Sequence, residues 1–325
     1  MRTPLEFIRS ASGMAGIFCV IGGVSCFTTQ DGVIKFLSGD YALHQIILIR
    51  AVIALIFTLV VFVPFEGGLR SLYTHRLGLH LTRAFAVVMA NLFFFTGLAT
   101  LPLGETVALV FVSPLLITIL AVVFLHEKIS FQRWIVVGIG MLGTLVMIRP
   151  GSSLFNPLMI LPLMAALCYA VFQIMSRNLG STERAASMAF YVQLTFITVS
   201  AFIGLLVGDG RFAEPENPTL DFLLRAWVWP ETRDLLLLCG IGCLSGMGAY
   251  LISQGYRISE ASLVAPFEFT GLIFAILWSI LFFGDWPDFM SWVGIALIFS
   301  AALLAFYQTT KDGNQTTHGI PEKTS

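Results

Sequence analysis

The sequence predicts an all-α integral membrane protein with ten transmembrane helices. Of its 325 residues, 57% are hydrophobic and only 11% are charged, whereas a typical soluble domain carries about 25% charged residues. A window of about 19 residues finds ten long apolar segments, with turn-forming residues between them. A soluble chain could not bury this much apolar surface, so soluble enzymes, nucleic-acid binders and disordered proteins are all excluded. The net charge of -1 also offers no basic surface for nucleic acid.

The ten segments are each long enough to cross a bilayer as a helix. They are predicted at residues 13–36, 42–63, 79–101, 105–125, 131–149, 157–178, 184–207, 234–257, 261–283 and 289–310. The first follows Arg2 and Arg9 but is too long for the apolar core of a signal peptide, so we expect it to be retained. In the eighth segment, Gly242 and Gly246 lie four residues apart, which predicts close packing against another helix.

The distribution of positive charge predicts the orientation. When the loops are assigned alternately to the two sides, twelve of the 18 Lys and Arg residues, including Arg83, lie on the side of the N-terminus and four on the other. Cytoplasmic loops carry the excess of Lys and Arg, so both termini are predicted to be cytoplasmic. Residues 311–325 are polar and are predicted to form a disordered cytoplasmic tail.

The two halves of the sequence resemble each other. Cys26 precedes Lys35 by nine residues, as Cys168 precedes Arg177. A second match with identical spacing pairs Glu127, Phe131 and Trp134 with Asp285, Phe289 and Trp292. Each half holds an odd number of spans, so the second half enters the membrane from the opposite side. This predicts an inverted repeat over residues 1–150 and 151–310, with a substrate site near the pseudo-two-fold axis.

Several motifs resemble the EamA-type repeats of the drug/metabolite transporter superfamily over nearly the whole chain. They are Gly97 to Glu105, Pro114, His126-Glu127 and Arg149-Pro150-Gly151 in the first half, and Gly255-Tyr256-Arg257, Val264 to Phe269 and Phe283-Gly284-Asp285 in the second. Glu260 departs from the small residue or proline expected at its position. The resemblance implies a ten-helix carrier of small metabolites in a bacterial inner membrane. Members of this kind move amino acids, riboflavin or S-adenosylmethionine.

Charged residues inside the spans need an explanation, because a charge at the bilayer centre costs about 2.5–3.5 kcal/mol. Asp31 and Arg50 lie at similar depth in the first hairpin, which predicts an ion pair or a shared polar network. The pair either stabilises the fold or serves substrate binding or coupling. Glu105 and Glu127, near the ends of spans, are interpreted as solvated or helix-capping residues.

Glu268 lies in the ninth span, two residues after Pro266. The proline frees a backbone carbonyl and favours a local break in the helix. A carboxylate beside irregular helix is a candidate proton carrier or ligand for a substrate amine. The alternative is a Glu held for packing by a partner such as Arg257 or a tyrosine.

Further polar side chains predict a cavity for a planar ligand, which aromatic rings would stack against and amides would bind at its edges. These candidates are Asn91, Tyr169, Gln173, Tyr250 and Gln254. The alternative is hydrogen bonding between helices, worth about 0.6 kcal/mol for each bond.

The sequence therefore predicts an alternating-access carrier driven by a proton or substrate gradient, with riboflavin or a similar planar metabolite as the first-choice substrate. Amino-acid or drug export is the alternative within the same class. A membrane-embedded enzyme would need a constellation such as paired aspartates or HExxH, which the sequence lacks. A non-transporting scaffold is the remaining alternative. The expected partners are the substrate, the lipid bilayer and protons; no metal or cofactor is expected, and the oligomeric state and the direction of transport stay open.

Overall fold

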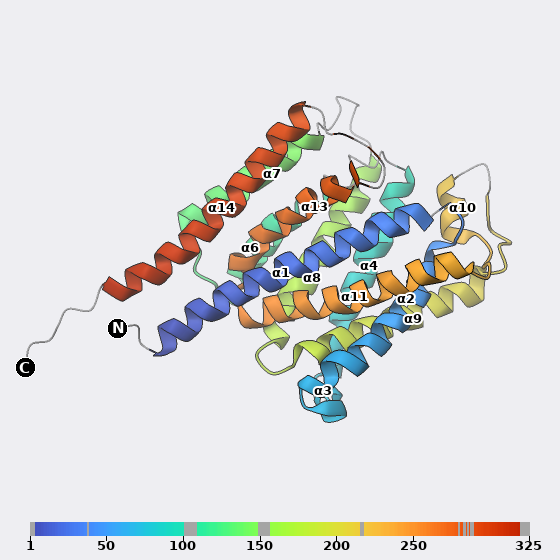
Figure 1. Cartoon of the computed structure of the whole chain (residues 1–325), viewed down its shortest axis with the longest axis horizontal. Helices are drawn as coiled ribbons and strands as arrows, with labels where there is room; N and C mark the ends of the chain where they lie inside the picture. Colours follow the sequence, from blue (N-terminus) through green and yellow to red (C-terminus); the bar gives the residue numbers. More distant parts are fainter. Residues whose placement is uncertain are drawn as a thin grey trace, which may run out of the picture.

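The computed structural model describes residues 4–37, 39–100, 109–148, 157–214, 218–278, 280–281, 284, 286 and 289–318. Within these ranges every regular element is a helix (Figure 1). Six helices are long and apolar enough to cross a membrane, and they span Gly13–Leu37, Leu43–Phe65, Leu77–Gly97, Ile160–Leu179, Ala185–Val207 and Thr232–Ile258. Four shorter apolar helices cover Ser113–Leu125, Phe131–Val146, Ala261–Ala275 and Trp292–Leu304. Each predicted segment overlaps one of these helices.

In the described part of the N-terminal half there are five main helices, and the second span is continued by irregular turns. The elements are α1 (Pro4–Leu37), α2 (Leu43–Phe57), the π-helical turn η1 (Thr58–Phe62), α3 (Val63–Phe65), η2 (Gly68–Leu72), α4 (Leu77–Thr100), α6 (Ser113–Leu125) and α7 (Phe131–Ile148). The helix α6 ends where His126 adopts a left-handed conformation with φ 53°. Such a residue stops a helix because the carbonyls beyond it no longer align.

The other elements that the structure describes lie in the C-terminal half. They are η3 (Pro157–Met159), α8 (Ile160–Leu179), α9 (Ala185–Val207), α10 (Pro218–Leu224), α11 (Thr232–Ile258), α12 (Ala261–Val264), η4 (Ala265–Phe269), α13 (Thr270–Trp278) and α14 (Phe289–His318). Helix α14 continues through His318, so the tail predicted to be disordered from residue 311 begins inside a helix. No proline interrupts residues 311–318, and polar residues are compatible with a helix that extends into water. Residues 319–325 lie outside the described ranges.

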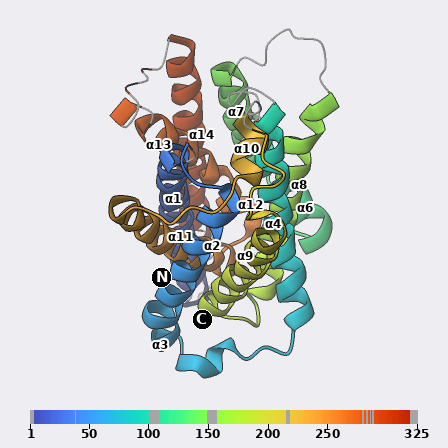
Figure 2. The ribbon, with the colours of Figure 1, turned by 90° about the vertical axis from the view of Figure 1, so that its right-hand side faces the viewer.

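The helices pack mainly between the two halves of the chain. Helix α1 packs against α11, α4 against α8, α2 against α9, and α6 against α12 and η4. Helix α7 packs along α14, and Figure 1 shows this pair at one edge of the bundle. Figure 2 shows α2, α4 and α9 on the side away from α14. The two halves are therefore interleaved rather than placed side by side.

Close packing at Gly242 and Gly246, as the sequence predicts, is confirmed. A Cβ atom on Gly242 would lie 2.5 Å from Cβ of Ile53, and one on Gly246 would lie 3.0 Å from the backbone oxygen of Ala54. Both glycines therefore allow α11 to approach the backbone of α2.

Gly242→Ala is expected to lower the thermal unfolding midpoint of the purified protein, because its methyl group forces α11 away from α2 at a cost of about 1–3 kcal/mol. Gly240→Ala is the matched control, since a Cβ atom there meets nothing within 4 Å. The control should leave the midpoint unchanged or raise it, because alanine favours a helix over glycine. Equal midpoints for the two variants would contradict the packing argument.

The irregular helix predicted around Pro266 is also confirmed. The ninth predicted segment starts as α12, tightens into the 3₁₀ turn η4 at Ala265–Phe269, and resumes as α13. The proline lies at the start of the tight turn and has no backbone N–H to donate. This break places Glu268 in a non-α segment that packs against α6, α14 and α1.

Candidate functional site

Glu268 lies at the centre of a buried polar cluster. Its side chain is 6% exposed, and one carboxylate oxygen, Oε1, accepts three hydrogen bonds. The donors are the hydroxyl of Tyr256 at 2.7 Å, the amide Nε2 of Gln173 at 3.2 Å and the hydroxyl of Tyr169 at 3.3 Å. Three neutral donors on one oxygen stabilise a buried carboxylate without a cation beside it.

The second carboxylate oxygen of Glu268 is open. No described side chain donates to Oε2. Because Oε2 is also not among the fully buried polar atoms without a partner, part of its surface is accessible. Oε1 of the neighbouring Gln173, in contrast, is buried and accepts no hydrogen bond from the described residues. A buried acceptor without a partner is costly unless a ligand or water satisfies it. The cluster therefore presents two acceptor oxygens to a proton or to a donor group of a ligand.

Three elements bring the cluster together. Tyr169 and Gln173 lie four residues apart on α8 and therefore share one face, and Gln173 Nε2 also donates to the Tyr169 hydroxyl at 2.7 Å. Tyr256 comes from the last turns of α11, and Glu268 from η4. The sequence predicted Tyr169, Gln173 and Glu268 as site residues but missed Tyr256. The available signal was the short connection from α11 to α12, which keeps Tyr256 near the ninth span.

Arg257, the predicted alternative partner of Glu268, lies elsewhere. Its Nε donates to the backbone oxygen of Glu183 at 3.1 Å, and its Nη1 donates to Oε1 of Gln254 at 3.0 Å. Of the two kinds of partner named in that alternative, Arg257 does not bind Glu268, whereas tyrosines do. A cation would have neutralised the carboxylate, whereas the hydroxyls bring no opposite charge to it.

Asp31 and Arg50 form a second polar locus. The Asp31 carboxylate, beside the amide of Gln30, interacts electrostatically with the Arg50 guanidinium, but no ion pair within 4 Å joins the two among the described residues. Arg50 is 6% exposed, and its carbon Cζ lies 5.3 Å from the ring centroid of Phe196. Its Nε atom is buried without a partner in the described part of the chain. The predicted pair is thus a longer-range interaction, and the guanidinium keeps donor capacity for a ligand.

The other predicted site residues do not join the Glu268 cluster. Asn91 donates to the backbone oxygen of Val87 on its own helix at 3.0 Å. Tyr250 donates to Glu66 Oε1 at 3.0 Å and stacks on Phe62 with ring centroids 3.9 Å apart. Gln254 accepts from Arg257, as described above. The expectation of one shared cavity for all these side chains is therefore not met by their contacts.

Carboxylates of the N-terminal half cap helices of the C-terminal half at the end of the bundle where α1 begins. Glu127 accepts from the backbone N–H groups of Ala261 at 2.9 Å and Ser262 at 3.0 Å, at the start of α12. Glu66 accepts from the N–H of Ala186 at 3.0 Å, at the start of α9. Negative charge at a helix N-terminus is stabilising, so the capping role predicted for Glu127 is confirmed. Glu105 lies outside the described residues.

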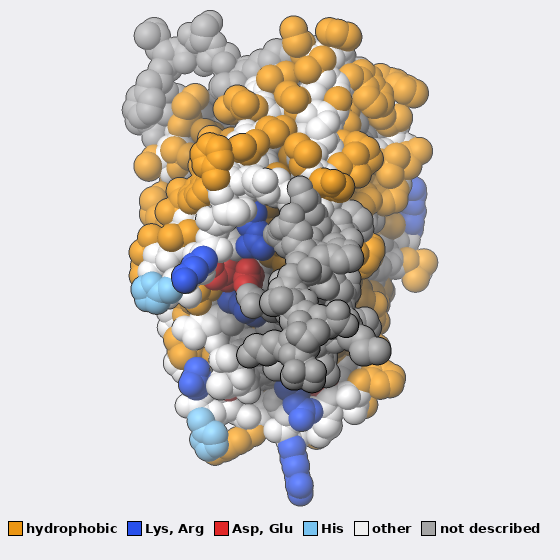
Figure 3. Space-filling view, turned by 90° about the vertical axis from the view of Figure 1, so that its left-hand side faces the viewer, with side chains coloured by type: hydrophobic (Ala, Val, Ile, Leu, Met, Phe, Trp, Pro, Cys, Tyr) orange, Lys and Arg blue, Asp and Glu red, His pale blue; other side chains and the backbone are white. Residues whose placement is uncertain are grey.

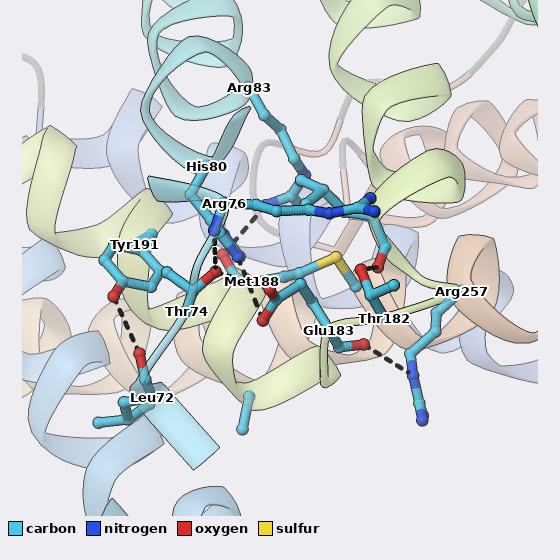
Figure 4. A network of polar contacts seen from close by, with 12 residues as sticks. Leu72, Thr74, Arg76, His80, Arg83, Thr182, Glu183, Met188, Tyr191 and Arg257 are labelled. Atoms are coloured by element: carbon cyan, nitrogen blue, oxygen red, sulfur yellow. Dashed lines mark hydrogen bonds and ion pairs between the residues drawn. The ribbon is translucent and has the colours of Figure 1, made fainter. Parts of the chain in front are cut away.

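Charged side chains gather at this same end. Figure 3 views the bundle from the end where α1 begins and shows Lys and Arg around a patch of acidic side chains, with hydrophobic side chains covering the upper part of the face. Arg133 pairs with Glu260 at 3.2 Å. Glu183 lies 3.6 Å from Nε2 of His80 and accepts a hydrogen bond from the Thr74 hydroxyl at 2.6 Å; Figure 4 shows the three residues. Polar contacts therefore tie the two halves together here.

At the opposite end, Tyr41 donates to Oδ2 of Asp234 at 2.7 Å. Burial, together with this carboxylate, raises the pKa of Tyr41, so its hydroxyl stays protonated as a donor. The side chain of Gln45 bonds both the N–H and the C=O of Val228, at 3.2 Å and 2.5 Å. The two halves are therefore also connected at this end, while the Glu268 cluster lies between the two sets of contacts.

Comparisons with known proteins give the family. The model of the EamA-like transporter family matches residues 14–149 and again 156–307. A riboflavin transporter from Vibrio cholerae is 29% identical over 281 residues, which cover 84% of this chain and 88% of that protein. An S-adenosylmethionine uptake transporter from Rickettsia prowazekii is 27% identical over 262 residues, which cover 78% and 81%.

A solved crystal structure shares the fold, with a TM-score of 0.74 over 93% of this chain and 98% of that chain, at 16% identity. The match of the family model covers both halves of the chain, including the helices that hold Glu268, Tyr169 and Tyr256. The chain is therefore a membrane protein that belongs to the EamA-like transporter family.

Proposed function

We propose that the chain is a secondary carrier that moves a small organic metabolite across a bacterial inner membrane, with riboflavin or a similar planar metabolite as the lead substrate. The observation that carries the proposal is the buried Glu268 cluster. A carboxylate with one free oxygen, inside a broken helix of a bundle with no nucleotide-binding motif, suits ion or substrate binding in a carrier.

The composition of the cluster supports a planar substrate. Tyr169 and Tyr256 place aromatic rings beside the carboxylate, and Gln173 supplies an amide with an unused oxygen. Aromatic faces stack on planar rings, while carboxylate and amide oxygens accept from ring N–H groups. The relatives from Vibrio cholerae and Rickettsia prowazekii are named as transporters of riboflavin and of S-adenosylmethionine, and both of these compounds carry planar ring systems.

Alternating access is supported by the way the helices pair. If the chain is two inverted five-helix repeats over residues 1–150 and 151–310, each span has a counterpart five spans later. Three of the observed contacts, α2–α9, α6–α12/η4 and α7–α14, then join a helix to its own counterpart. The contact α1–α11 is related to the contact α4–α8, because the two-fold axis replaces α1 by α8 and α11 by α4. Rocking of such repeats about a central site is the general mechanism of inverted-repeat carriers. In this proposal both termini and the Glu66 and Glu127 caps are cytoplasmic.

Substrate profiling tests the proposal. Bacteria that cannot make riboflavin and lack an importer of their own would express the chain and receive labelled riboflavin or labelled S-adenosylmethionine. We expect accumulation of riboflavin above that of cells expressing Glu268→Gln at equal protein level. Failure to accumulate or to release either compound, with the protein present in the membrane, would remove these substrates from consideration.

Transport of an amino-acid-bearing or drug-like substrate, including export, is the second candidate. The observation that favours it is the free Oε2 of Glu268, which can bind a substrate ammonium group as readily as a proton. Preloaded membrane vesicles measure both directions: faster loss of a labelled amine-bearing compound from vesicles with the wild-type chain would support export.

A non-transporting scaffold makes a different prediction. Cysteines replacing Asn91, Gln173, Tyr250 and Glu268 in a background without other cysteines would stay unreactive toward a small water-soluble thiosulfonate. The carrier predicts reaction at position 268, where the carboxylate oxygen is open. Protection of this cysteine by riboflavin would further support a substrate site.

A further inference from the structure

Arg83 is a fully buried cation that the charge count placed among the cytoplasmic surface residues. In the structure its side chain is 0% exposed and reaches from α4 into the bundle. All three of its nitrogens are used: Nε donates to Ser176 Oγ at 2.6 Å, Nη2 to Ser253 Oγ at 3.0 Å and Nη1 to the backbone oxygen of Met188 at 3.0 Å. Figure 4 shows the side chain beside Met188. Arg83 thereby joins α4 to α8, α9 and α11.

The acceptors around Arg83 are neutral. No carboxylate lies within 4 Å of it among the described residues, and the ring of Phe172 lies 4.3 Å from its Cζ atom. A titratable side chain, His80, lies one turn earlier on α4 and feels the positive charge of Arg83. A buried charge without a counterion is costly. Apolar residues of similar volume can often replace a buried charged network without loss of stability, so packing alone does not explain an arginine here.

The helices clamped by Arg83 are the ones that supply the donors of Glu268. On α8, Ser176 lies three residues after Gln173; on α11, Ser253 lies three residues before Tyr256. Residues three apart are neighbours on a helix surface. Ser176 also donates its own proton to the backbone oxygen of Phe172 at 2.7 Å, which leaves its lone pairs for Arg83. Two short paths therefore connect the guanidinium to the carboxylate, one through each helix.

We propose that Arg83 is a positioning residue of the Glu268 site: by clamping Ser176 to Ser253 it sets the distance at which Gln173 and Tyr256 both reach Oε1 of Glu268. The inference rests on the proposed role of Glu268 as the proton or substrate ligand. Arg83 itself does not contact the Glu268 carboxylate; it acts on the site through the two helices that carry Gln173 and Tyr256.

Chemical modification of Glu268 tests the clamp without any substrate. The purified full-length chain in detergent would be treated with dicyclohexylcarbodiimide, which adds to carboxyl groups in apolar surroundings, and the modified peptide would be quantified by mass spectrometry. A carboxyl oxygen that has lost donors is the better nucleophile. We expect Ser176→Ala, Ser253→Ala and Arg83→Met to raise the initial rate at Glu268 about tenfold, the effect of weakening roughly one charge-assisted hydrogen bond.

Ser187→Ala is the matched control, because Ser187 is a fully buried serine whose hydroxyl has no partner in the described part of the chain. Glu268→Gln identifies any signal from other carboxyls. The two serine variants keep the arginine, so they test the clamp even where Arg83→Met does not fold. Wild-type rates in Ser176→Ala and Ser253→Ala, or an equal rise in Ser187→Ala, would overturn the proposal. Because no transport is measured, a failed clamp leaves the carrier proposal standing, and a failed substrate assay leaves the clamp standing.

Discussion

Glu268→Gln is expected to abolish the dependence of transport on a proton gradient and to lower its rate by about ten- to hundredfold, the effect of losing a charge-assisted contact worth roughly 1.5–3 kcal/mol. The glutamine side chain has nearly the same shape, and its Oε1 can still accept from Tyr169, Gln173 and Tyr256. The fold is therefore kept while the charge is removed. Uptake into energised vesicles, with and without a proton gradient, measures the effect at equal protein content.

Glu231→Gln is the control for Glu268→Gln. Glu231 is an exposed residue before α11, so the same chemical change there should leave uptake unchanged. Glu268→Asp adds a second comparison, because it keeps the charge but draws it back from the tyrosines; partial activity that still responds to the gradient is expected. Gradient-dependent uptake by Glu268→Gln at the wild-type rate would show that the carboxylate carries neither protons nor substrate.

Much of the fold can be predicted from the sequence because each membrane span corresponds to a long run of apolar residues. Apolar length places each helix, and the turn residues between runs place most ends within a few residues, although α1 starts at Pro4, nine residues before the predicted span. Pro266 marks the break in the ninth segment, because a missing N–H acts locally. The extension of α14 to His318 was not foreseen, since polar residues in water can be helical or disordered and composition does not decide between them.

The site is harder to predict, because partners of buried polar groups come from helices far apart in the chain. Periodicity correctly grouped Tyr169 with Gln173 on one face of α8 but cannot tell which other helix that face meets. Tyr250 was expected to line the same cavity, yet its hydroxyl donates to Glu66 instead. Arg83 lies near the predicted end of a span, where an arginine usually reaches water. Only the packing of α4 against α8 shows that it points inward.

Arg50→Ala is expected to reduce transport by about tenfold or more while the amount of folded protein in the membrane stays near that of the wild type. Arg50 makes no ion pair within 4 Å in the described residues, and its Nε is unused, so little of its bonding capacity supports the fold. Its contact with Phe196 contributes about 0.5–2 kcal/mol. A ligand that accepts from the guanidinium would lose a charge-assisted contact worth roughly 1.5–3 kcal/mol. Uptake and protein level are measured in the same membranes.

A double variant separates this role from a structural ion pair between Asp31 and Arg50. If the pair only stabilises the fold, Arg50→Ala leaves the Asp31 carboxylate in the span without a compensating positive charge. Adding Asp31→Asn should then restore both protein level and uptake. If Arg50 binds the substrate, the double variant stays inactive at a normal protein level, because the donor itself is missing. Arg50→Lys keeps the charge but not the planar fork of donors. Partial uptake by that variant, with a weaker apparent affinity and an unchanged maximal rate, would place the loss at binding rather than at the conformational step.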